Sequence, residues 1–359
     1  MSPSPFSGGG IRGGVQAHRL RIPANLPTQL ILDMRADDGV ETLLRGKSQR
    51  LRPLRIESGG PVLHDLPDRL VRLLADQFHH MTMIPGPHIG MTTWETSTLH
   101  EDMVAGCQNV DMVIVPSQHN VDVFEEAGIP VSLVPYPVAL PVALPVVPVE
   151  LAAITEDTFV FYTVATWQER KNILGLITAF LTSHTGNETV ELVIKTHGNA
   201  LSIASEINRH RTTLNLRGPG PKITVITRPL SEDELWGLHQ RGDCFVSLTR
   251  GEAYGLPILD AAVAENPLIV SGYGGHLDYL DNQPGVALVD GRMAPVVQPY
   301  ALYSADQEWF DPDLLDASAK MREVAVLGRS QRYIRTFSNL KYEIVGTRLL
   351  ECLNGNRSG

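Results

Sequence analysis

Short apolar runs alternate with amphipathic stretches along most of this 359-residue chain. The runs at 112–116, 158–165 and 190–195 are rich in β-branched and other apolar residues, which predicts buried strands. The stretches at 118–127 and 173–181 place apolar residues at helical spacing, which predicts amphipathic helices. Strands that alternate with helices predict an α/β fold, in which helices cover both faces of a parallel sheet.

A proline-rich segment interrupts this alternation in the middle of the chain. Residues 135–148 repeat Pro-Val-Ala-Leu twice, and so many prolines are incompatible with a helix or a central strand. We therefore expect an extended, semi-rigid connection between two Rossmann-like, doubly wound lobes that face each other across a cleft. The expected units are a first lobe over 1–148, a second lobe over 149–305 and C-terminal helices over 306–359 that pack on the lobes or cross between them.

The first lobe is less clearly patterned at its start than later in the chain. The glycines at 8–10, 13 and 14 predict either a loop that a ligand approaches closely or a flexible tail. No strand precedes them, and a dinucleotide-binding loop should follow a strand. Strands are expected at 30–34, 81–84 and 89–93, helices at 66–75 and 99–109, and C-terminal helices at 314–327, 330–337 and 342–353.

One strand–loop–helix–strand unit, at 243–271, carries the most informative loop of the chain. The loop and the helix after it hold two carboxylates, Glu252 and Asp260, with seven residues between them. Gly255 and Pro257 suit a helix start whose free N–H groups form an anion site. Carboxylates beside such a helix end suit a sugar nucleotide, because the acids bind hydroxyls and the backbone binds the diphosphate.

Further candidates lie at the ends of other predicted strands. Arg170 and Lys171 stand at a loop-to-helix junction where a phosphate would meet both their charge and the helix end, although basic pairs are also common on solvated surfaces. Lys195 ends a buried strand and is expected either at the cleft edge or in solvent. Glu95 follows a strand in the first lobe, where open α/β sheets place ligands, and His100 is either a base or an exposed polar residue.

Charge is unevenly distributed along the chain, whose formal net charge is −10. Residues 12–72 contain eleven Lys or Arg against seven acids, whereas residues 73–150 contain nine acids and no Lys or Arg. The basic segment indicates either a surface for an anionic partner, such as a lipid or a nucleic acid, or an ordinary solvated face.

The cysteines and the N-terminus indicate a cytoplasmic protein. The three cysteines, Cys107, Cys244 and Cys352, are far apart and form no CxxC pair, so we expect reduced core residues. The first residues lack the basic start and apolar run of a signal peptide, and six prolines interrupt the longest apolar stretch, at 127–149. The expected location is the cytoplasm, with peripheral association at a membrane left open. Oligomeric state cannot be inferred from these features.

Four segments, taken in order, resemble retaining glycosyltransferases of the GT-B fold, in particular glycosyltransferase family 4. The segment from Gly251 to Val270 resembles the family's pattern of two acids, an aromatic residue with glycine, a proline and an alanine-rich helix, with Gly274 and Gly275 behind it. The Glu-Arg-Lys-Asn sequence at 169–172 resembles the family's phosphate-binding element. Trp-Glu-Thr and Val-Pro-Ser, within 94–117, resemble its acceptor lobe.

This resemblance implies a metal-independent hexosyltransferase (EC 2.4) that uses a nucleoside-diphosphate sugar, UDP- or GDP-linked, as co-substrate and needs no cofactor. Lys171 would contact the diphosphate, with Arg170 or Lys195 as a second cation because Thr166 stands where many members carry arginine. Glu252 would lie beside the sugar, and Asp260, where glutamate is usual, would bind the ribose. The implied catalytic residues are Glu252, Lys171 and Glu95. The donor set adds Arg170, Lys195, Tyr254, Gly255, Leu256 and Asp260, and the acceptor side comprises Glu95, Thr96, His100 and Gly10.

The sequence leaves the hydroxyl acceptor open: it is a glycan, a lipid, a small molecule or a modified DNA base. The main alternative is a catalytically silent nucleotide-sugar-binding module, which the shortened Asp260 and the Thr166 position favour. An epimerase or a phosphorylase on the same fold is less favoured, because the sequence shows neither the pyridoxal-phosphate lysine context nor the second set of carboxylates that such enzymes would need. No metal is implied, since no DxD sequence flanks these sites. Asp311-Pro-Asp313 has that form, but it lies in the C-terminal segment and is expected to form a turn.

Overall fold

The computed structural model describes residues 54–55, 62–65 and 88–353, apart from residues 109, 139, 142–143, 185, 187, 217–219, 300–301 and 330. The predicted strands at 30–34 and 81–84, the helix at 66–75, Gly10 and most of the basic segment 12–72 lie outside the described residues. None of the described helices combines the length and the apolar composition that crossing a bilayer requires.

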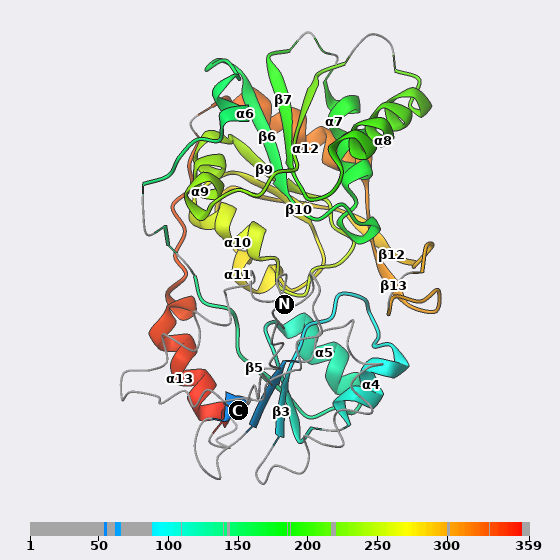
Figure 1. The fold of residues 1–359 in the computed structure, drawn as a ribbon, viewed down its shortest axis with the longest axis vertical. Coiled ribbons are helices and arrows are strands. Elements are labelled where there is room, and N and C mark those ends of the chain that lie inside the picture. The colour runs from blue at the N-terminus through cyan, green and yellow to red at the C-terminus, as the bar shows by residue number, and fades with distance from the viewer. Residues whose placement is uncertain are drawn as a thin grey trace, which may run out of the picture.

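The first lobe is built on a five-stranded sheet in the order β1-β2-β3-β4-β5 (Figure 1). Strands β2 to β5 are parallel and β1 is antiparallel to β2. Trp94, Met103 and Phe124 form a core between this sheet and its helices, because their side chains are large, apolar and fully buried. The elements are β1 (Leu54–Arg55), β2 (Val62–Asp65), β3 (His88–Met91), α4 (Glu101–Cys107), β4 (Met112–Val115), α5 (Gln118–Glu126) and β5 (Val131–Leu133).

The second lobe is built on a six-stranded parallel sheet in the order β11-β10-β9-β6-β7-β8. Its strands are β6 (Phe159–Val164), β7 (Val190–Lys195), β8 (Lys222–Ile226), β9 (Cys244–Ser247), β10 (Leu268–Ser271) and β11 (Val286–Val289). The chain runs outward from β6 to β8 and then returns to the other side of β6 as β9. Strands β6 and β9 therefore flank a topological switch point, and ligands of open α/β sheets bind at the carboxyl ends of such strands.

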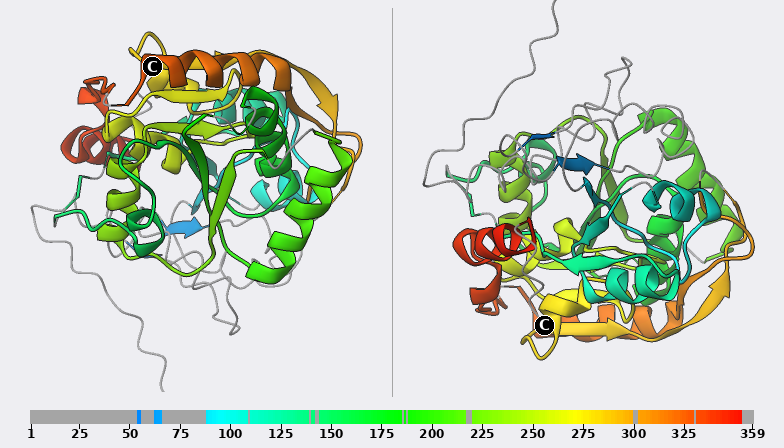
Figure 2. Two further views of the ribbon diagram at one scale, coloured as in Figure 1. Left: turned by 90° about the horizontal axis from the view of Figure 1, so that it is seen from above. Right: turned by 90° about the horizontal axis from the view of Figure 1, so that it is seen from below.

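Helices cover both faces of the second sheet, as the continuous apolar strands predict (Figure 2). Successive residues of β6 point to opposite faces, so Phe161 packs with α7 and α12 whereas Tyr162 packs with α9 and α10. Ser231 and Glu234 form a capping box at the start of α9. The helices are α6 (Val149–Ala152), α7 (Ile173–Ser183), α8 (Ala200–Thr213), α9 (Glu232–Arg241), α10 (Leu256–Val263), α11 (Leu277–Leu280) and α12 (Leu314–Leu327), with the 3₁₀ turn η1 (Glu169–Lys171) before α7.

The C-terminal segment returns to the first lobe (Figure 1). Helix α12 packs on the second sheet, and α13 (Tyr342–Leu353) buries Val345 and Leu349 against the first sheet. The prediction of a helix at 330–337 is wrong: residues 331–337 have no regular secondary structure, and η2 (Ser338–Leu340) precedes α13. Arginine side chains in this strap donate to backbone carbonyls of the second lobe, which an extended chain reaches more readily than a helix.

A β-hairpin that the sequence did not predict projects from the second lobe. It consists of antiparallel β12 (Gly291–Pro295) and β13 (Glu308–Pro312), and we call these strands with their connecting loop the hairpin. The prediction of a turn at Asp311-Pro-Asp313 is also wrong. Asp311 and Pro312 end β13, and Asp313 caps α12 by accepting hydrogen bonds from the backbone of Leu315 and Asp316.

Candidate active site

Two loops meet at the switch point between β6 and β9. After β6, η1 ends at Asn172, whose left-handed backbone (φ 49°) suits asparagine better than most other residues and starts α7. Gly175 leaves room for the Asn172 side chain, because a Cβ there would lie 2.3 Å from its Oδ1 atom. This turn directs Arg170 and Lys171 toward the loop after β9.

The loop after β9 is bonded to the first loop through its backbone. The N–H of Arg250 donates to the carbonyl of Arg170 at 2.7 Å, and Arg170 Nη1 donates to the carbonyl of Gly251 at 2.6 Å. Gly255 then takes a left-handed conformation (φ 82°) and starts α10, with proline in the first turn as the sequence predicts. Both loops are therefore held in one arrangement at the carboxyl edge of the sheet.

Four charged side chains meet at this edge and form what we call the charge cluster: Glu95, Arg170, Lys171 and Glu252. Lys171 Nζ lies 2.5 Å from Glu252 Oε1, and Arg170 Nη1 lies 3.8 Å from Glu252 Oε2. Arg170 Nη2 lies 3.0 Å from Glu95 Oε1, which comes from the first lobe. The side chains are only 10–15% exposed, so their attraction is screened less than at a surface. The structure thus brings together the three predicted catalytic residues and Arg170.

Burial and opposite charge act against each other on the ionisation of this cluster. Burial alone would raise the pKa of Glu252, but Lys171 and Arg170 outweigh it and hold that pKa below its usual value. Burial, together with the positive charge of Arg170, lowers the pKa of Lys171. The cluster therefore places the ionised Glu252 carboxylate beside two cations, a set that can bind hydroxyls at one point and an anionic group at another.

The two lobes touch directly around the charge cluster. A Cβ on Gly251 would lie 2.3 Å from the carbonyl oxygen of Glu95, so glycine allows this approach of the two backbones. Ser117 Oγ, at the start of α5, donates to the carbonyl of Ala253 at 2.6 Å. The N–H of Gln118 donates to Asp278 Oδ2 at 2.6 Å. Both lobes contribute to the site, and these contacts set their separation.

The other predicted donor residues lie around the same loop with different roles in the packing. Lys195, at the end of β7, donates to the carbonyl of Thr196 at 2.9 Å and is buried. The hydroxyl of Tyr254 donates to the carbonyl of Tyr136 in the interlobe connection at 2.9 Å. Leu256 begins α10 and is half-buried, and so is Asp260 on the same helix.

Two predicted acceptor-side residues contribute to packing within the first lobe. Thr96 is fully buried, where its hydroxyl accepts a hydrogen bond from the Trp94 indole at 2.7 Å and donates to the carbonyl of Thr98. His100 caps α4, because its Nδ1 accepts from the N–H of Asp102 at 3.1 Å. Gly10, the fourth predicted acceptor-side residue, lies outside the described residues.

Sequence reasoning missed three polar residues, His119, Tyr273 and His276, that lie where the two lobes touch. His276 is fully buried, with Nε2 2.8 Å from the carbonyl of Ser271 and Nδ1 without a hydrogen-bond partner among the described residues. Burial lowers the pKa of His276, and it lowers the pKa of His119 to about 4, so both imidazoles are neutral at pH 7. Tyr273 stacks on Phe310 and meets the edge of His119. The position of His276 directly after Gly274-Gly275 is the one sequence signal that could have identified it.

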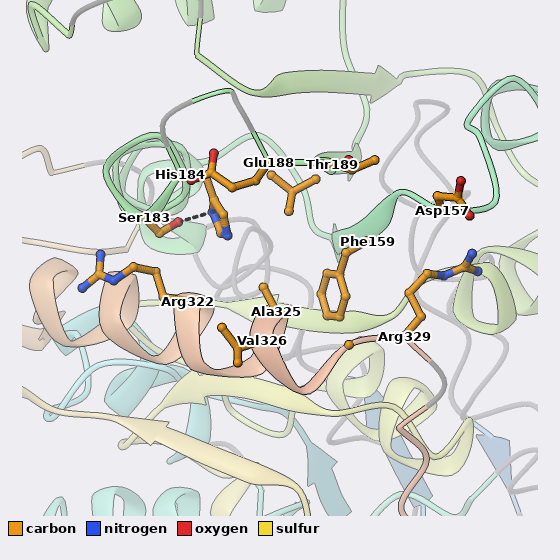
Figure 3. Close-up of a pocket in the computed structure, with 12 residues that line it drawn as sticks. Asp157, Phe159, Ser183, His184, Glu188, Thr189, Arg322, Ala325, Val326 and Arg329 are labelled. Atoms are coloured by element: carbon orange, nitrogen blue, oxygen red, sulfur yellow. Dashed lines mark hydrogen bonds between the residues drawn. The ribbon is translucent and has the colours of Figure 1, made fainter.

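A separate pocket of about 460 Å³ lies at the opposite edge of the second sheet, between the starts of β6 and β7 and the end of α12 (Figure 3). Phe159, Ala325 and Val326 line it together with two arginines, Arg322 and Arg329. Because ligands of open α/β sheets bind at the carboxyl ends of the strands, this pocket is not the candidate active site.

Comparison with known proteins places the fold. No protein-family model matches the chain, and no curated protein matches it in sequence. The structure is similar to the UDP-forming α,α-trehalose-phosphate synthase of Burkholderia xenovorans, with a TM-score of 0.52, 12% identity and coverage of 83% of this chain and 74% of that one. It is also similar to Anabaena Alr3699/HepE in complex with UDP and glucose, with a TM-score of 0.51, 13% identity and coverage of 79% and 76%.

A third structure, the pneumococcal O-GlcNAc transferase GtfA with UDP and GlcNAc, matches 78% of this chain with a TM-score of 0.48 and 14% identity. This chain spans about half of that protein, 54% of its length. Identities this low establish the fold alone, and the fold is confirmed as predicted: α/β, of the GT-B type, with two Rossmann-like lobes across a cleft.

Proposed function

We propose that the protein transfers a hexose-type sugar from a nucleoside-diphosphate sugar to a hydroxyl acceptor. The observation that carries this proposal is the charge cluster, because it places an ionised carboxylate and two cations at the switch point of the second lobe. UDP is the first nucleotide to test, since Anabaena HepE, a protein of similar fold, was solved with UDP and glucose.

The proposed donor position follows from charge. The diphosphate would bind at Lys171 and Arg170, beside the start of α10 at Gly255 and Leu256. Glu252 would then face the sugar and bind its hydroxyls. Asp260, farther along α10, would bind the ribose, and Lys195 would supply further positive charge at the end of β7.

The proposed reaction retains the configuration of the sugar, as in glycosyltransferase family 4. The bond between the anomeric carbon and the diphosphate oxygen breaks, and a bond from that carbon to the acceptor oxygen forms. The acceptor's hydroxyl proton passes to the departing diphosphate oxygen. Lys171 and Arg170 stabilise the negative charge that develops on the diphosphate, and Glu252 supports the positive charge on the sugar. We propose no metal in this step.

The first test identifies the donor. UDP-, GDP-, ADP- and TDP-sugars are added separately to the full chain, and melting temperature is recorded. A ligand at 100 times its Kd stabilises the folded state by about 2.7 kcal/mol, so a true donor raises the melting temperature measurably. If no nucleotide sugar shifts the transition at millimolar concentration, the proposed function is wrong.

The second test assigns the residues. Glu252→Gln and Lys171→Met should each lower UDP release from the selected UDP-sugar by about 100- to 1000-fold, because each removes charge that acts in the transition state. Lys222→Met is the matched control, since Lys222 also pairs with a glutamate, Glu191, at 3.0 Å, but on strands β8 and β7. The control should keep the parent rate, and EDTA should leave all rates unchanged.

A catalytically silent nucleotide-sugar-binding module is the second candidate. The shorter Asp260 side chain and the uncharged Thr166 favour it, because both weaken the donor site relative to the family pattern. Such a module would bind UDP and release none from any UDP-sugar. For an active enzyme, the basic segment 12–72 makes DNA and anionic vesicles the first acceptors to screen at low ionic strength.

A further inference from the structure

The hairpin of the second lobe reaches the first lobe beside the candidate active site (Figure 1). Leu302, from the hairpin loop, packs in the core of the first lobe with Trp94. The N–H of Ser97 donates to the carbonyl of Glu308, and Gln307 Nε2 donates to the carbonyl of Thr98, both at 2.9 Å. Segment 94–98 of the first lobe is therefore held by the second lobe.

The hairpin contacts the donor-side loop as well. The N–H of Phe310 donates to the carbonyl of Arg250 at 2.8 Å. The Arg250 guanidinium lies 5.3 Å from the centre of the Trp309 ring, and its Nε atom lies 3.6 Å from Asp311 Oδ1. One element thus binds both the loop that carries Glu252 and the segment that carries Glu95.

Tyr303 makes the contact that matters most for the charge cluster. Its hydroxyl donates to Glu95 Oε2 at 2.6 Å, whereas Arg170 binds the other carboxylate oxygen at 3.0 Å. The Tyr303 ring is 5% exposed, its centre lies 5.6 Å from that of Trp94, and the Arg170 guanidinium lies 6.0 Å from its centre. Each oxygen of Glu95 has its own donor, so the carboxylate is held in one orientation.

We propose that Tyr303 is a positioning residue for Glu95, and that the hairpin completes the acceptor side of the site from the opposite lobe. This proposal rests on the proposed function. A carboxylate fixed at both oxygens holds the incoming hydroxyl in a defined direction relative to the sugar, and orientation of reactants contributes strongly to rate. Tyr303 acts through Glu95 and does not itself contact the reacting atoms.

The experiment compares Tyr303→Phe, Glu95→Gln and the double variant, with UDP-glucose, UDP-galactose and UDP-N-acetylglucosamine as probes and water as acceptor. UDP release gives kcat and KM. Tyr303→Phe should lower kcat about tenfold and change the donor KM less than twofold, because the donor binds to the second lobe. The double variant should be no slower than Glu95→Gln alone, since Tyr303 acts only through Glu95.

Tyr162→Phe is the control, because it also removes a buried tyrosine hydroxyl, which lies 2.8 Å from His239 Nδ1 and accepts a hydrogen bond from Asn266 Nδ2 at 2.8 Å. It should lower the melting temperature and keep the parent kcat. A Tyr303→Phe enzyme with the parent kcat, or additive losses in the double variant, overturns the positioning role. A parent protein that neither binds nor cleaves any of the UDP-, GDP-, ADP- and TDP-sugars overturns the proposed function instead, and the positioning role falls with it.

Discussion

At the residue scale, the second lobe buries neutral imidazoles in its core. His239 lies fully inside, with Nδ1 2.8 Å from the Tyr162 hydroxyl and with the Trp236 and Phe245 rings beside it. Burial lowers the pKa of His239 from 6.5 to about 3. The native state therefore keeps this histidine neutral over a pH range in which the unfolded chain protonates it.

This difference predicts that stability falls as pH falls from 6.5 toward 3. Within that window the unfolded state binds one more proton at His239, so this residue alone contributes about 1.4 kcal/mol of lost stability per pH unit. Urea unfolding of the parent and of His239→Gln at pH 6, 5 and 4 measures the effect. The slope of unfolding free energy against pH should be shallower in the variant by about that amount, and equal slopes would contradict the pKa.

Single residues also show where sequence reasoning stops. Arg170, Lys171 and Glu252 were predicted together, because each lies at the end of a recognisable strand and the topology of parallel sheets brings such ends to one edge. Tyr303 could not be found in this way. Its partner Glu95 is 208 residues away in the chain, and the contact depends on a hairpin that has no clear strand pattern.

At the element scale, the strap at 331–337 has no regular secondary structure and is held to the second lobe mainly by one arginine side chain, Arg335. Arg335 donates to the carbonyls of Ala262, Asn266, Pro284 and Gly285 at 2.9–3.3 Å. The apolar spacing predicted a helix here, but an extended strap lets one guanidinium bind four carbonyls at once. Helix patterns elsewhere, such as α7 and α12, were correct because an apolar face packs on the sheet.

Loss of this guanidinium should destabilise the second lobe. Arg335→Met should lower the unfolding free energy by about 2 kcal/mol, because it leaves partly buried carbonyls without a charged donor. Arg332→Met is the matched control, since Arg332 is exposed and binds the carbonyls of Gln240 and Gly242 near the surface. Chemical denaturation of both variants measures the difference. An equal loss of unfolding free energy in both variants would mean that the hydrogen bonds of Arg335 stabilise the fold no more than those of Arg332.

At the scale of the whole molecule, three segments of the described chain connect the two lobes, in addition to the direct contacts around the charge cluster. They are the proline-rich connection, the hairpin and the strap that leads to α13. The sequence predicted two lobes and their connection, because a composition break and alternating elements are local signals. It did not predict how closely the lobes approach, because that distance depends on single glycines such as Gly251.

Gly251→Ala tests how much this close approach matters. A methyl group there would lie 2.3 Å from the carbonyl oxygen of Glu95, and the obstacle is backbone of the other lobe, so the two lobes must separate by about 1 Å to reach an ordinary contact of about 3.5 Å. Misplacement of this size can lower rate by about 100-fold. UDP release should therefore fall by about that factor, with UDP affinity changed less than fivefold because the nucleotide binds to the second lobe.

The matched control for this variant is Gly272→Ala, which crowds only the carbonyl of Val289 within the same lobe, at 3.1 Å. This variant should lower the melting temperature and keep the parent turnover of the UDP-sugar. Calorimetry with UDP and turnover measurements on both variants separate binding from chemistry. If Gly251→Ala turns over within threefold of the parent, turnover does not depend on the two lobes keeping their present separation.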